Sequence, residues 1–187
     1  MHKLEQALAD TSVLGATLRN AIQTQLPLVV VTTPALAPLA ARWVAARDIV
    51  QLGADESARG VGWSIAAGVL ARSDAPGWVV LPGDMPLVRP ATMLAVAAAL
   101  DLHPVAYAQH RGRGGQPVGF AGELSSELVS LHGDEGTRRL VARYPAFEVE
   151  VDDPGVLMGV DTEVELAAVR AAHAGAAGAA PRAGTAP

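Results

Sequence analysis

Short apolar runs alternate with amphipathic stretches along most of the chain. Residues 28–31 are apolar at every position, which is typical of a strand covered on both faces of a sheet. Stretch 12–25 instead has apolar residues at helical spacing, and Ser12 is placed to cap its first turn. By the same criteria, strands are predicted at 28–31, 49–52, 78–81, 105–108, 116–120 and 147–151, and helices at 12–25, 35–46, 64–71, 91–100, 123–131 and 136–143.

The C-terminal part of the chain has a different residue pattern. Thr162 and Glu165 form a capping-box pattern that predicts the start of a last helix. From about Ala174 the sequence is Ala, Gly and Pro with almost no charge, so we expect residues 174–187 to be a disordered tail. Strands that alternate with helices predict one domain over 1–173, an α/β fold with a parallel or mixed, mostly parallel sheet and helices on both faces.

Composition narrows the class of protein. The chain has 187 residues, half of them apolar, which suffices for one good core. A net charge of −5 and a pI near 5.5 argue against nucleic acid or an anionic membrane as partner. The absence of cysteine excludes disulfides and thiolate chemistry, and the five histidines lack metal-ligand spacing, so no zinc site is expected. Without a signal or spanning segment, we expect a soluble, cytoplasmic protein.

The run 78–86 is the strongest local signal. Four apolar residues end at Pro82 and Gly83 and deliver one carboxylate, Asp84, into a turn that Pro86 constrains. Ligands of open α/β sheets bind beyond the carboxyl ends of the strands, where this acid is expected. The alternative is that Asp84 only shapes the turn, since Asp between Gly and Pro is ordinary turn chemistry.

A second acid precedes the last helix. Asp161 follows a Gly-Val pair, and by itself it is explained by a favourable interaction with the helix dipole of about 0.3–1 kcal/mol. Together with Asp84 it would supply the one or two carboxylates that Mg²⁺ takes when substrate phosphates complete its shell. Only the fold can bring these two acids together.

Two glycine-bearing stretches are candidates for anion binding. Gly60, Gly62 and Ser64 stand at a predicted helix start, where backbone N–H groups and a hydroxyl can contact a phosphate or a base. Segment 111–115, which includes Arg113, can hold an anionic substrate through its arginines. The alternative without a ligand is a flexible loop for the first stretch and a solvated loop for segment 111–115.

Six stretches, read together, resemble one family. They are His-Lys-Leu-Glu-Gln at 2–6, Gly-Val-Gly-Trp-Ser-Ile-Ala-Ala-Gly at 60–68, Leu-Pro-Gly-Asp-Met-Pro-Leu-Val at 81–88, Arg-Gly-Gly-Gln-Pro-Val at 113–118, Gly-Asp-Glu-Gly-Thr-Arg at 133–138 and Val-Asp-Thr-Glu-Val-Glu-Leu at 160–166. In this order they resemble the MobA/MocA-type nucleotidyltransferases of molybdenum cofactor maturation, and most closely the cytidylyltransferase branch.

The resemblance implies a Rossmann-like, three-layer α/β/α fold that joins a nucleoside monophosphate to the phosphate of molybdopterin and releases pyrophosphate. It assigns Asp84 and Asp161 to Mg²⁺, and Lys3 to the triphosphate as a catalytic contact. Pro82 and Gly83 belong to the motif around Asp84, while Gly60, Gly62 and Ser64 would lie near the nucleotide. The loop that includes Arg113 and Gln116 would face the pterin, although family members usually carry His in place of Gln116.

One departure concerns the beginning of the family pattern. The family opens with a strand and a glycine-rich, arginine-bearing loop that ends in a lysine. Only this final lysine has a counterpart here, which is Lys3. That strand would lie between strands 28–31 and 78–81, and each buried backbone group left unpaired by its loss costs roughly 1–3 kcal/mol. We therefore expect native residues upstream of Met1, or else a truncated homologue that holds CTP poorly.

Three functional hypotheses follow. The first is a Mg²⁺-dependent transferase that moves CMP from CTP to molybdopterin. The second keeps the fold but uses GTP or a sugar-phosphate acceptor. The third is a non-catalytic domain that binds the pterin or a partner in molybdoenzyme maturation.

Overall fold

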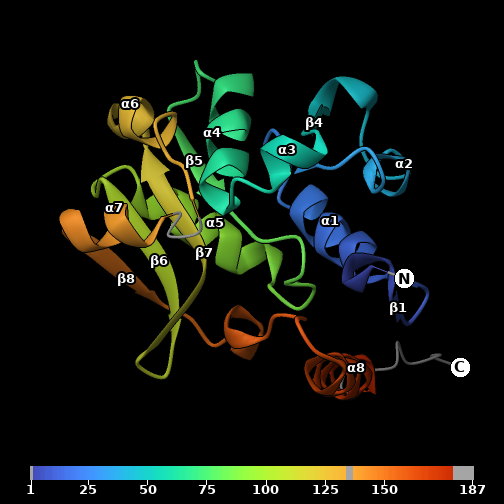
Figure 1. The fold of residues 1–187 in the computed structure, drawn as a ribbon. Coiled ribbons are helices and arrows are strands. Elements are labelled where there is room, and N and C mark those ends of the chain that lie inside the picture. Colours follow the sequence, from blue (N-terminus) through green and yellow to red (C-terminus); the bar gives the residue numbers. More distant parts are fainter. Residues whose placement is uncertain (1, 134–136, 179–187) are drawn as a thin grey trace, which may run out of the picture.

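Strands and helices alternate in the computed structural model, which describes residues 2–133 and 137–178 (Figure 1). The resemblance motif at 133–138 therefore lies partly outside the described residues. The helices are α1 (Val13–Gln23), α2 (Ala37–Ala40), α3 (Ala54–Ser57), α4 (Val61–Ala71), α5 (Pro90–Ala99), α6 (Ser125–Leu128), α7 (Arg138–Arg143) and α8 (Glu163–Gly178), with 3₁₀ turns η1 (Lys3–Glu5), η2 (Ala46–Asp48), η3 (Gly122–Leu124) and η4 (Pro154–Leu157). The strands are β1 (Ala7–Leu8), β2 (Thr11–Ser12), β3 (Val30–Thr32), β4 (Ile49–Gln51), β5 (Gly77–Val80), β6 (Val105–His110), β7 (Arg113–Ala121) and β8 (Ala146–Glu150).

The main sheet is mixed and has the order β5-β7-β6-β8. β7 runs antiparallel to both β5 and β6, whereas β8 pairs parallel to β6. The α/β class is confirmed, and so is the mostly parallel sheet: β5, β6 and β8 run in one direction, and of the described strands of this sheet β7 alone runs against them. β7 is reversed by the hairpin between β6 and β7, in which His110 pairs with Arg113 and the intervening Arg111 and Gly112 have φ values of 51° and 74°. Positive φ at both central residues is the geometry of a tight hairpin turn.

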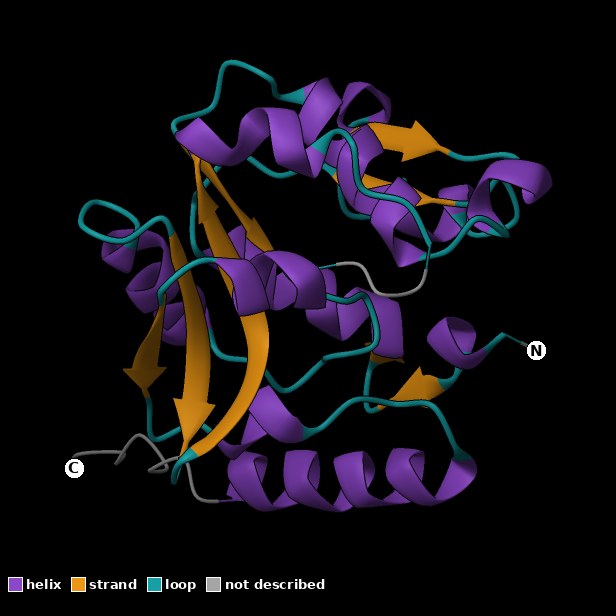
Figure 2. Ribbon diagram, turned by 60° about the vertical axis from the view of Figure 1, so that its left-hand side comes forward, coloured by secondary structure: helices purple, strands orange, loops and turns teal. Residues whose placement is uncertain are grey.

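Within the described residues, a second, parallel sheet consists of β3 and β4 (Figure 2). Helix α4 covers both sheets: Gly68 lies close to Val31 of β3, while Ile65 and Val69 pack in the core cluster beside Trp78 and Val80 of β5. Among the described residues, β3 has one partner strand, and so has β5. The strand that the family resemblance places between them is not among the described strands.

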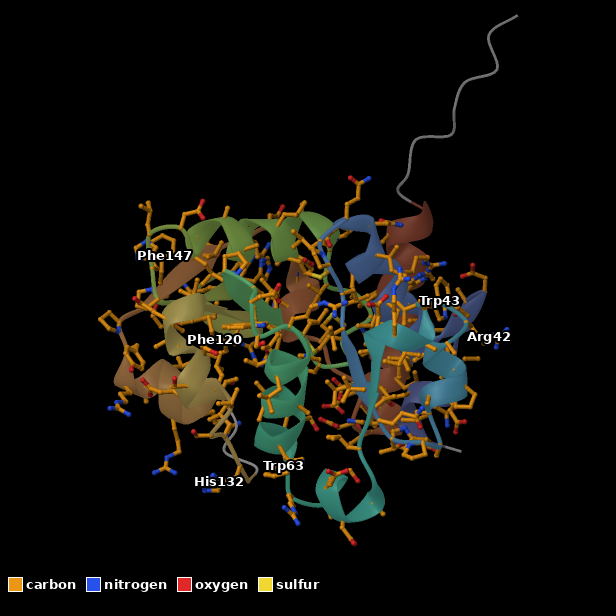
Figure 3. The ribbon with its side chains drawn as sticks, turned by 90° about the horizontal axis from the view of Figure 1, so that it is seen from above. Arg42, Trp43, Trp63, Phe120, His132 and Phe147 are labelled. Atoms are coloured by element: carbon orange, nitrogen blue, oxygen red, sulfur yellow. The ribbon has the colours of Figure 1, made fainter. Side chains whose placement is uncertain are left out.

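The largest core cluster joins α4 to the main sheet. Phe120 of β7 is fully buried at its centre, together with Val105 and Leu128, and Figure 3 shows Phe120 in the interior of the molecule. Truncation of such a side chain to Ala typically costs 3–5 kcal/mol. This packing fixes β5, and with it the loop that carries Asp84.

Of the predicted boundaries, the ends of the second helix and of the last helix differ most from the structure. The helix expected at 35–46 is helical only over Ala37–Ala40, because Leu36 provides no capping side chain and the following residues form turns. The last helix extends to Gly178, past the expected start of a disordered tail at Ala174, because alanine is the best helix former. Residues 179–187 of that expected tail lie outside the described residues. Within the described part of the chain, no helix combines the length and apolar character needed to cross a bilayer.

Candidate active site

Three charged side chains from distant parts of the chain meet at one point. Lys3 Nζ lies 2.6 Å from Asp84 Oδ2 and 2.5 Å from Asp161 Oδ1, so the ammonium bridges both carboxylates. The exposed fraction of the side chain is 17% for Asp84, 37% for Lys3 and 72% for Asp161. The two predicted metal ligands therefore share one cation at the surface of the protein.

Lys3 is positioned by a short, self-capped turn. In η1 the ring Nδ1 of His2 accepts a hydrogen bond from the Leu4 N–H at 3.2 Å, and Glu5 Oε2 accepts one from the His2 N–H at 2.9 Å. Leu4 packs against the two core clusters around α1. The backbone of Lys3 is thus fixed while its side chain reaches outward.

Asp84 follows β5 in a turn whose carbonyl groups accept hydrogen bonds from side chains of α1. The Met85 N–H donates to the Pro82 carbonyl at 3.3 Å, which closes the turn. Thr17 Oγ1 donates to the Gly83 carbonyl at 2.9 Å, and Asn20 Nδ2 donates to the Pro86 carbonyl at 2.9 Å. Sequence reasoning missed Thr17 and Asn20 as positioning residues. The available signal was that each is a polar residue on the otherwise apolar face of the helix predicted at 12–25.

Asp161 is brought to this turn by its own backbone neighbours. The Val160 N–H donates to the Asp84 carbonyl at 3.1 Å, and the Val160 side chain is buried in a cluster with Leu8 and Val13. On its other side, Asp161 leads into α8, where Glu165 Oε2 accepts hydrogen bonds from the N–H groups of Asp161 and Thr162 at 2.9 and 2.8 Å. The capping box predicted at Thr162 and Glu165 is confirmed.

The electrostatics favour a cation between the two acids. Burial of Lys3 alone would lower its pKa, but the hydrogen bonds to Asp161 and Asp84 outweigh that effect, and the pKa of Lys3 is raised above its ordinary value. Two carboxylates against one ammonium leave a net charge of −1. The ammonium therefore only partly neutralises the pair, and a dication would be attracted more strongly.

The donor set fits a hard divalent cation. Two carboxylates already converge on one positive charge, which is the arrangement that Mg²⁺ or Mn²⁺ needs when water and substrate phosphates fill the other positions. No cluster of three or more His, Cys, Asp or Glu side chains suited to a metal occurs in the described ranges 2–133 and 137–178. A surface cavity of about 310 Å³ lies elsewhere, lined in part by Pro76, Leu102 and Glu123.

The predicted nucleotide residues lie at the start of α4. Gly60 has a φ of 94°, a conformation that side chains rarely adopt, and Ser64 is partly buried in the first turn. The Gly62 N–H donates to the Gly133 carbonyl at 3.0 Å, so this amide is already engaged within the protein. The Arg59 guanidinium lies 4.9 Å from the centre of the Trp63 ring, and Figure 3 shows Trp63 and His132 at the same end of α4.

The predicted pterin loop is mostly strand. Arg113 and Gln116 belong to β7, with Arg113 exposed and Gln116 partly buried. Their neighbouring glycines serve packing: a Cβ on Gly114 would lie 2.9 Å from the Tyr107 ring, and one on Gly115 would lie 2.2 Å from the Val156 carbonyl oxygen. In the described structure, no hydrogen bond or ion pair joins Arg113 or Gln116 to the two acids.

A family model provides the decisive comparison. The model of the MobA-like NTP transferase domain matches residues 1–149, which is most of the chain. The chain belongs to the MobA-like NTP transferase domain family. The matched region contains Lys3 and Asp84, whereas Asp161 lies beyond it. A search of curated proteins found no match.

Solved structures agree with this family assignment. Rv0371c from Mycobacterium tuberculosis H37Rv is 29% identical, with 91% of this chain and 90% of that chain covered at a TM-score of 0.78; its complex with manganese superposes with a TM-score of 0.75. A nucleotidyl transferase from Methanothermobacter (21% identity, 94% and 87% covered, TM-score 0.77) and molybdopterin-guanine dinucleotide biosynthesis protein A from Archaeoglobus fulgidus (15%, 94% and 92%, 0.65) share the fold. The three-layer nucleotidyltransferase fold expected for this MobA-like domain is confirmed.

Proposed function

We propose that this MobA-like protein transfers CMP from CTP to the terminal phosphate of molybdopterin, with release of pyrophosphate. The observation that carries the proposal is the convergence of Asp84 and Asp161 on one cation. Family membership supports a nucleotidyltransferase, and the motifs at 60–68, 81–88 and 113–118 support the cytidylyltransferase branch. The manganese complex of Rv0371c supports a divalent cofactor, for which we propose Mg²⁺.

In the proposed reaction an oxygen of the acceptor phosphate attacks the α-phosphorus of CTP. The new P–O bond replaces the bond to the β-phosphate, and pyrophosphate leaves with the electron pair. Asp84 and Asp161 would hold Mg²⁺, which supplies positive charge to the crowded phosphate oxygens when bound. Lys3 would bind phosphate with its ammonium, and alignment of the two phosphates is the main task of the protein.

The remaining contacts are proposed by resemblance to the family. Gly60, Gly62 and Ser64 would lie near the nucleotide; because the Gly62 N–H is engaged by Gly133 and a Cβ on Gly62 would lie 2.9 Å from the His132 backbone nitrogen, the proposed role of Gly62 is to let the backbone at 132–133 pack against the start of α4. Arg113 and Gln116 would contact the pterin or its phosphate, and Pro82 and Gly83 would shape the turn at Asp84. A molybdoenzyme maturation partner would receive the product.

We also propose that full activity needs a further strand between β3 and β5. Each of these strands has one partner among the described residues, and α4 packs against both. The four residues of β5, an edge strand of the main sheet, are all partly exposed, whereas a strand with partners on both sides in a covered sheet is typically buried. One extended segment between β3 and β5 would pair with the backbone N–H and C=O groups on the facing edges of these two strands.

The experiment is a pyrophosphate-release assay with Mg²⁺, molybdopterin, and CTP or GTP. It compares this chain with a form extended by any residues encoded in frame upstream, and each form with its Asp84→Asn variant. Asp101→Asn is the matched control, since Asp101 is an exposed acid outside the site. We expect pyrophosphate release with CTP. Asp84→Asn should abolish this release, whereas Asp101→Asn should retain it.

Other outcomes would redirect the assignment. Release with GTP, or with a sugar phosphate in place of molybdopterin, would favour the related transferase. Retained pterin binding without turnover in both forms would favour the non-catalytic binder. Near-normal turnover in Asp84→Asn would contradict the metal assignment.

A further inference from the structure

The Lys3 ammonium occupies the carboxylates that the proposed metal needs. Its contacts of 2.6 Å to Asp84 and 2.5 Å to Asp161 are direct and engage one oxygen of each acid. Both acids are thus tied to a positive charge that belongs to the chain itself. A divalent cation that binds at the same place would meet this charge.

We propose that Lys3 is an intramolecular competitor of the divalent cation, which must displace the ammonium before both acids can bind the metal. The displaced ammonium is then free to pair with a phosphate of the substrate. This inference rests on the metal site of the proposed function and adds to it an exchange of cations at Asp84 and Asp161.

Charge is the first reason for an exchange. The two acids carry two negative charges, so a dication alone neutralises them, whereas a dication and an ammonium together would leave an excess of positive charge at contact distance. Like charges this close repel strongly where the surroundings are partly dry, and Asp84 is only 17% exposed. The two cations therefore exclude each other from the pair of acids.

The reach of the Lys3 side chain is the second reason for an exchange of cations. The η1 backbone is held by Leu4 and by the reciprocal caps of His2 and Glu5, so release of Lys3 needs no movement of the fold. The Lys3 side chain is 37% exposed and its four-carbon stem is flexible. The ammonium can leave the acids by rotation of side-chain bonds and still remain beside them.

A permanent structural ion pair is the competing explanation. In that case Lys3 would hold Asp84 and Asp161 at the separation that the metal requires, and removal of Lys3 would weaken metal binding. The two explanations predict opposite changes in metal affinity for the same substitution. Measurement of that affinity without any substrate separates them.

The experiment is a titration with Mn²⁺, followed by electron paramagnetic resonance of the free ion. It compares the unchanged chain with Lys3→Met and Lys3→Gln, two neutral replacements that differ in polarity. Arg47→Met is the charge-matched control, because Arg47 is 86% exposed and lies 3.9 Å from its only paired acid, Asp48, among the described ion pairs. Asp84→Asn reports whether binding occurs at the proposed site.

We expect both Lys3 variants to bind Mn²⁺ roughly 3- to 30-fold more tightly than the unchanged chain, since two partly exposed ion pairs no longer compete. Arg47→Met should change the affinity less than about twofold. Without metal, Lys3→Met should unfold at a lower temperature than the unchanged chain, and Mn²⁺ should raise its melting temperature by a larger increment.

Equal or weaker Mn²⁺ binding in the Lys3 variants would overturn the competition while leaving the metal site intact, provided that Asp84→Asn abolishes binding. An equal gain in Arg47→Met would also overturn it, because net charge alone would then explain the effect. Absence of Mn²⁺ binding in every form would overturn both the competition and the proposed metal site.

Discussion

The backbone N–H of Val160 donates a hydrogen bond to the carbonyl oxygen of Asp84 at 3.1 Å. This bond is one of several contacts between the segment after β5 and the segment before α8. Asp153 Oδ2 accepts the Arg89 N–H at 2.9 Å, and a Cβ on Gly155 would meet the Leu87 carbonyl oxygen at 2.3 Å. The two acids meet because their backbones run side by side over these contacts.

Asp153 should be a stabilising residue of this arrangement. Its carboxylate is buried and accepts hydrogen bonds from the Arg89 N–H, from Thr92 Oγ1 at 2.6 Å and from the Gly155 N–H at 3.1 Å. Asp153→Asn exchanges a buried charged acceptor for an amide that meets donors on all sides, so we expect a loss of about 2–4 kcal/mol in the free energy of unfolding. Urea denaturation measures it.

The matched control for this loss is Asp152→Asn at the exposed neighbouring position. A surface substitution of this kind should stay within about 0.5 kcal/mol of the unchanged chain. Equal losses in the two variants would show that the buried hydrogen bonds of Asp153 do not hold the segment.

Gly115 should be required for packing rather than for anion binding. A Cβ at this position would lie 2.2 Å from the Val156 carbonyl oxygen, a contact with backbone that cannot move away cheaply. Gly115→Ala should therefore lower the free energy of unfolding by about 1–3 kcal/mol. Gly175→Ala on α8, where a Cβ meets nothing within 4 Å, should be neutral or stabilising by up to about 1 kcal/mol.

Thermal unfolding of both glycine variants, each with and without a phosphate-bearing ligand, distinguishes the two roles. A Gly115→Ala protein as stable as the unchanged chain but with weaker ligand binding would support the anion-binding interpretation instead.

Glu165 should make the stability of α8 depend on pH. The hydrogen bonds from the Asp161 N–H, and then from Thr162, hold the pKa of Glu165 below its ordinary value of 4.5. The folded protein therefore binds the proton less tightly than the unfolded chain does. The stabilisation is present above the ordinary glutamate pKa and is lost as the pH falls through the lowered pKa.

Glu165→Gln tests this dependence because it removes the titrating group and keeps an acceptor in the capping box. The difference in melting temperature between the unchanged chain and Glu165→Gln should be largest near pH 7 and should shrink as the pH is lowered from 5 toward 3. A constant difference across that range would contradict the lowered pKa.

Much of the fold could be predicted from local patterns. The N-cap at Ser12 is confirmed, with its hydroxyl accepting the Gly15 N–H at 3.1 Å, and each predicted strand overlaps an observed one. These features depend on neighbouring residues and are therefore visible in sequence. Strand direction is not, because the tight turn at Arg111 and Gly112, which makes β7 antiparallel, carries no Asn-Gly or Asp-Gly signature.

The candidate site was only partly accessible to sequence reasoning. The turns and the family motifs point to Asp84 and Asp161, but the meeting of these two acids depends on Val160 and Asp153, which have no local signal. The bridging by Lys3 was also missed, since the resemblance assigned that side chain to phosphate. The sequence suggests an anion-binding role for segment 111–115, and only three-dimensional packing reveals the close approach of Gly114 to Tyr107 and of Gly115 to Val156.

The central claim is that Asp84 and Asp161 jointly bind one divalent cation. Its most direct test is Mn²⁺ titration of the unchanged chain, Asp84→Asn, Asp161→Asn and the double variant, with unfolding curves to show that each remains folded. The account predicts one site, weakened at least about tenfold by either substitution, with the double variant little worse than the weaker single variant because the acids act on the same ion. Binding that is unchanged in both single variants would contradict it.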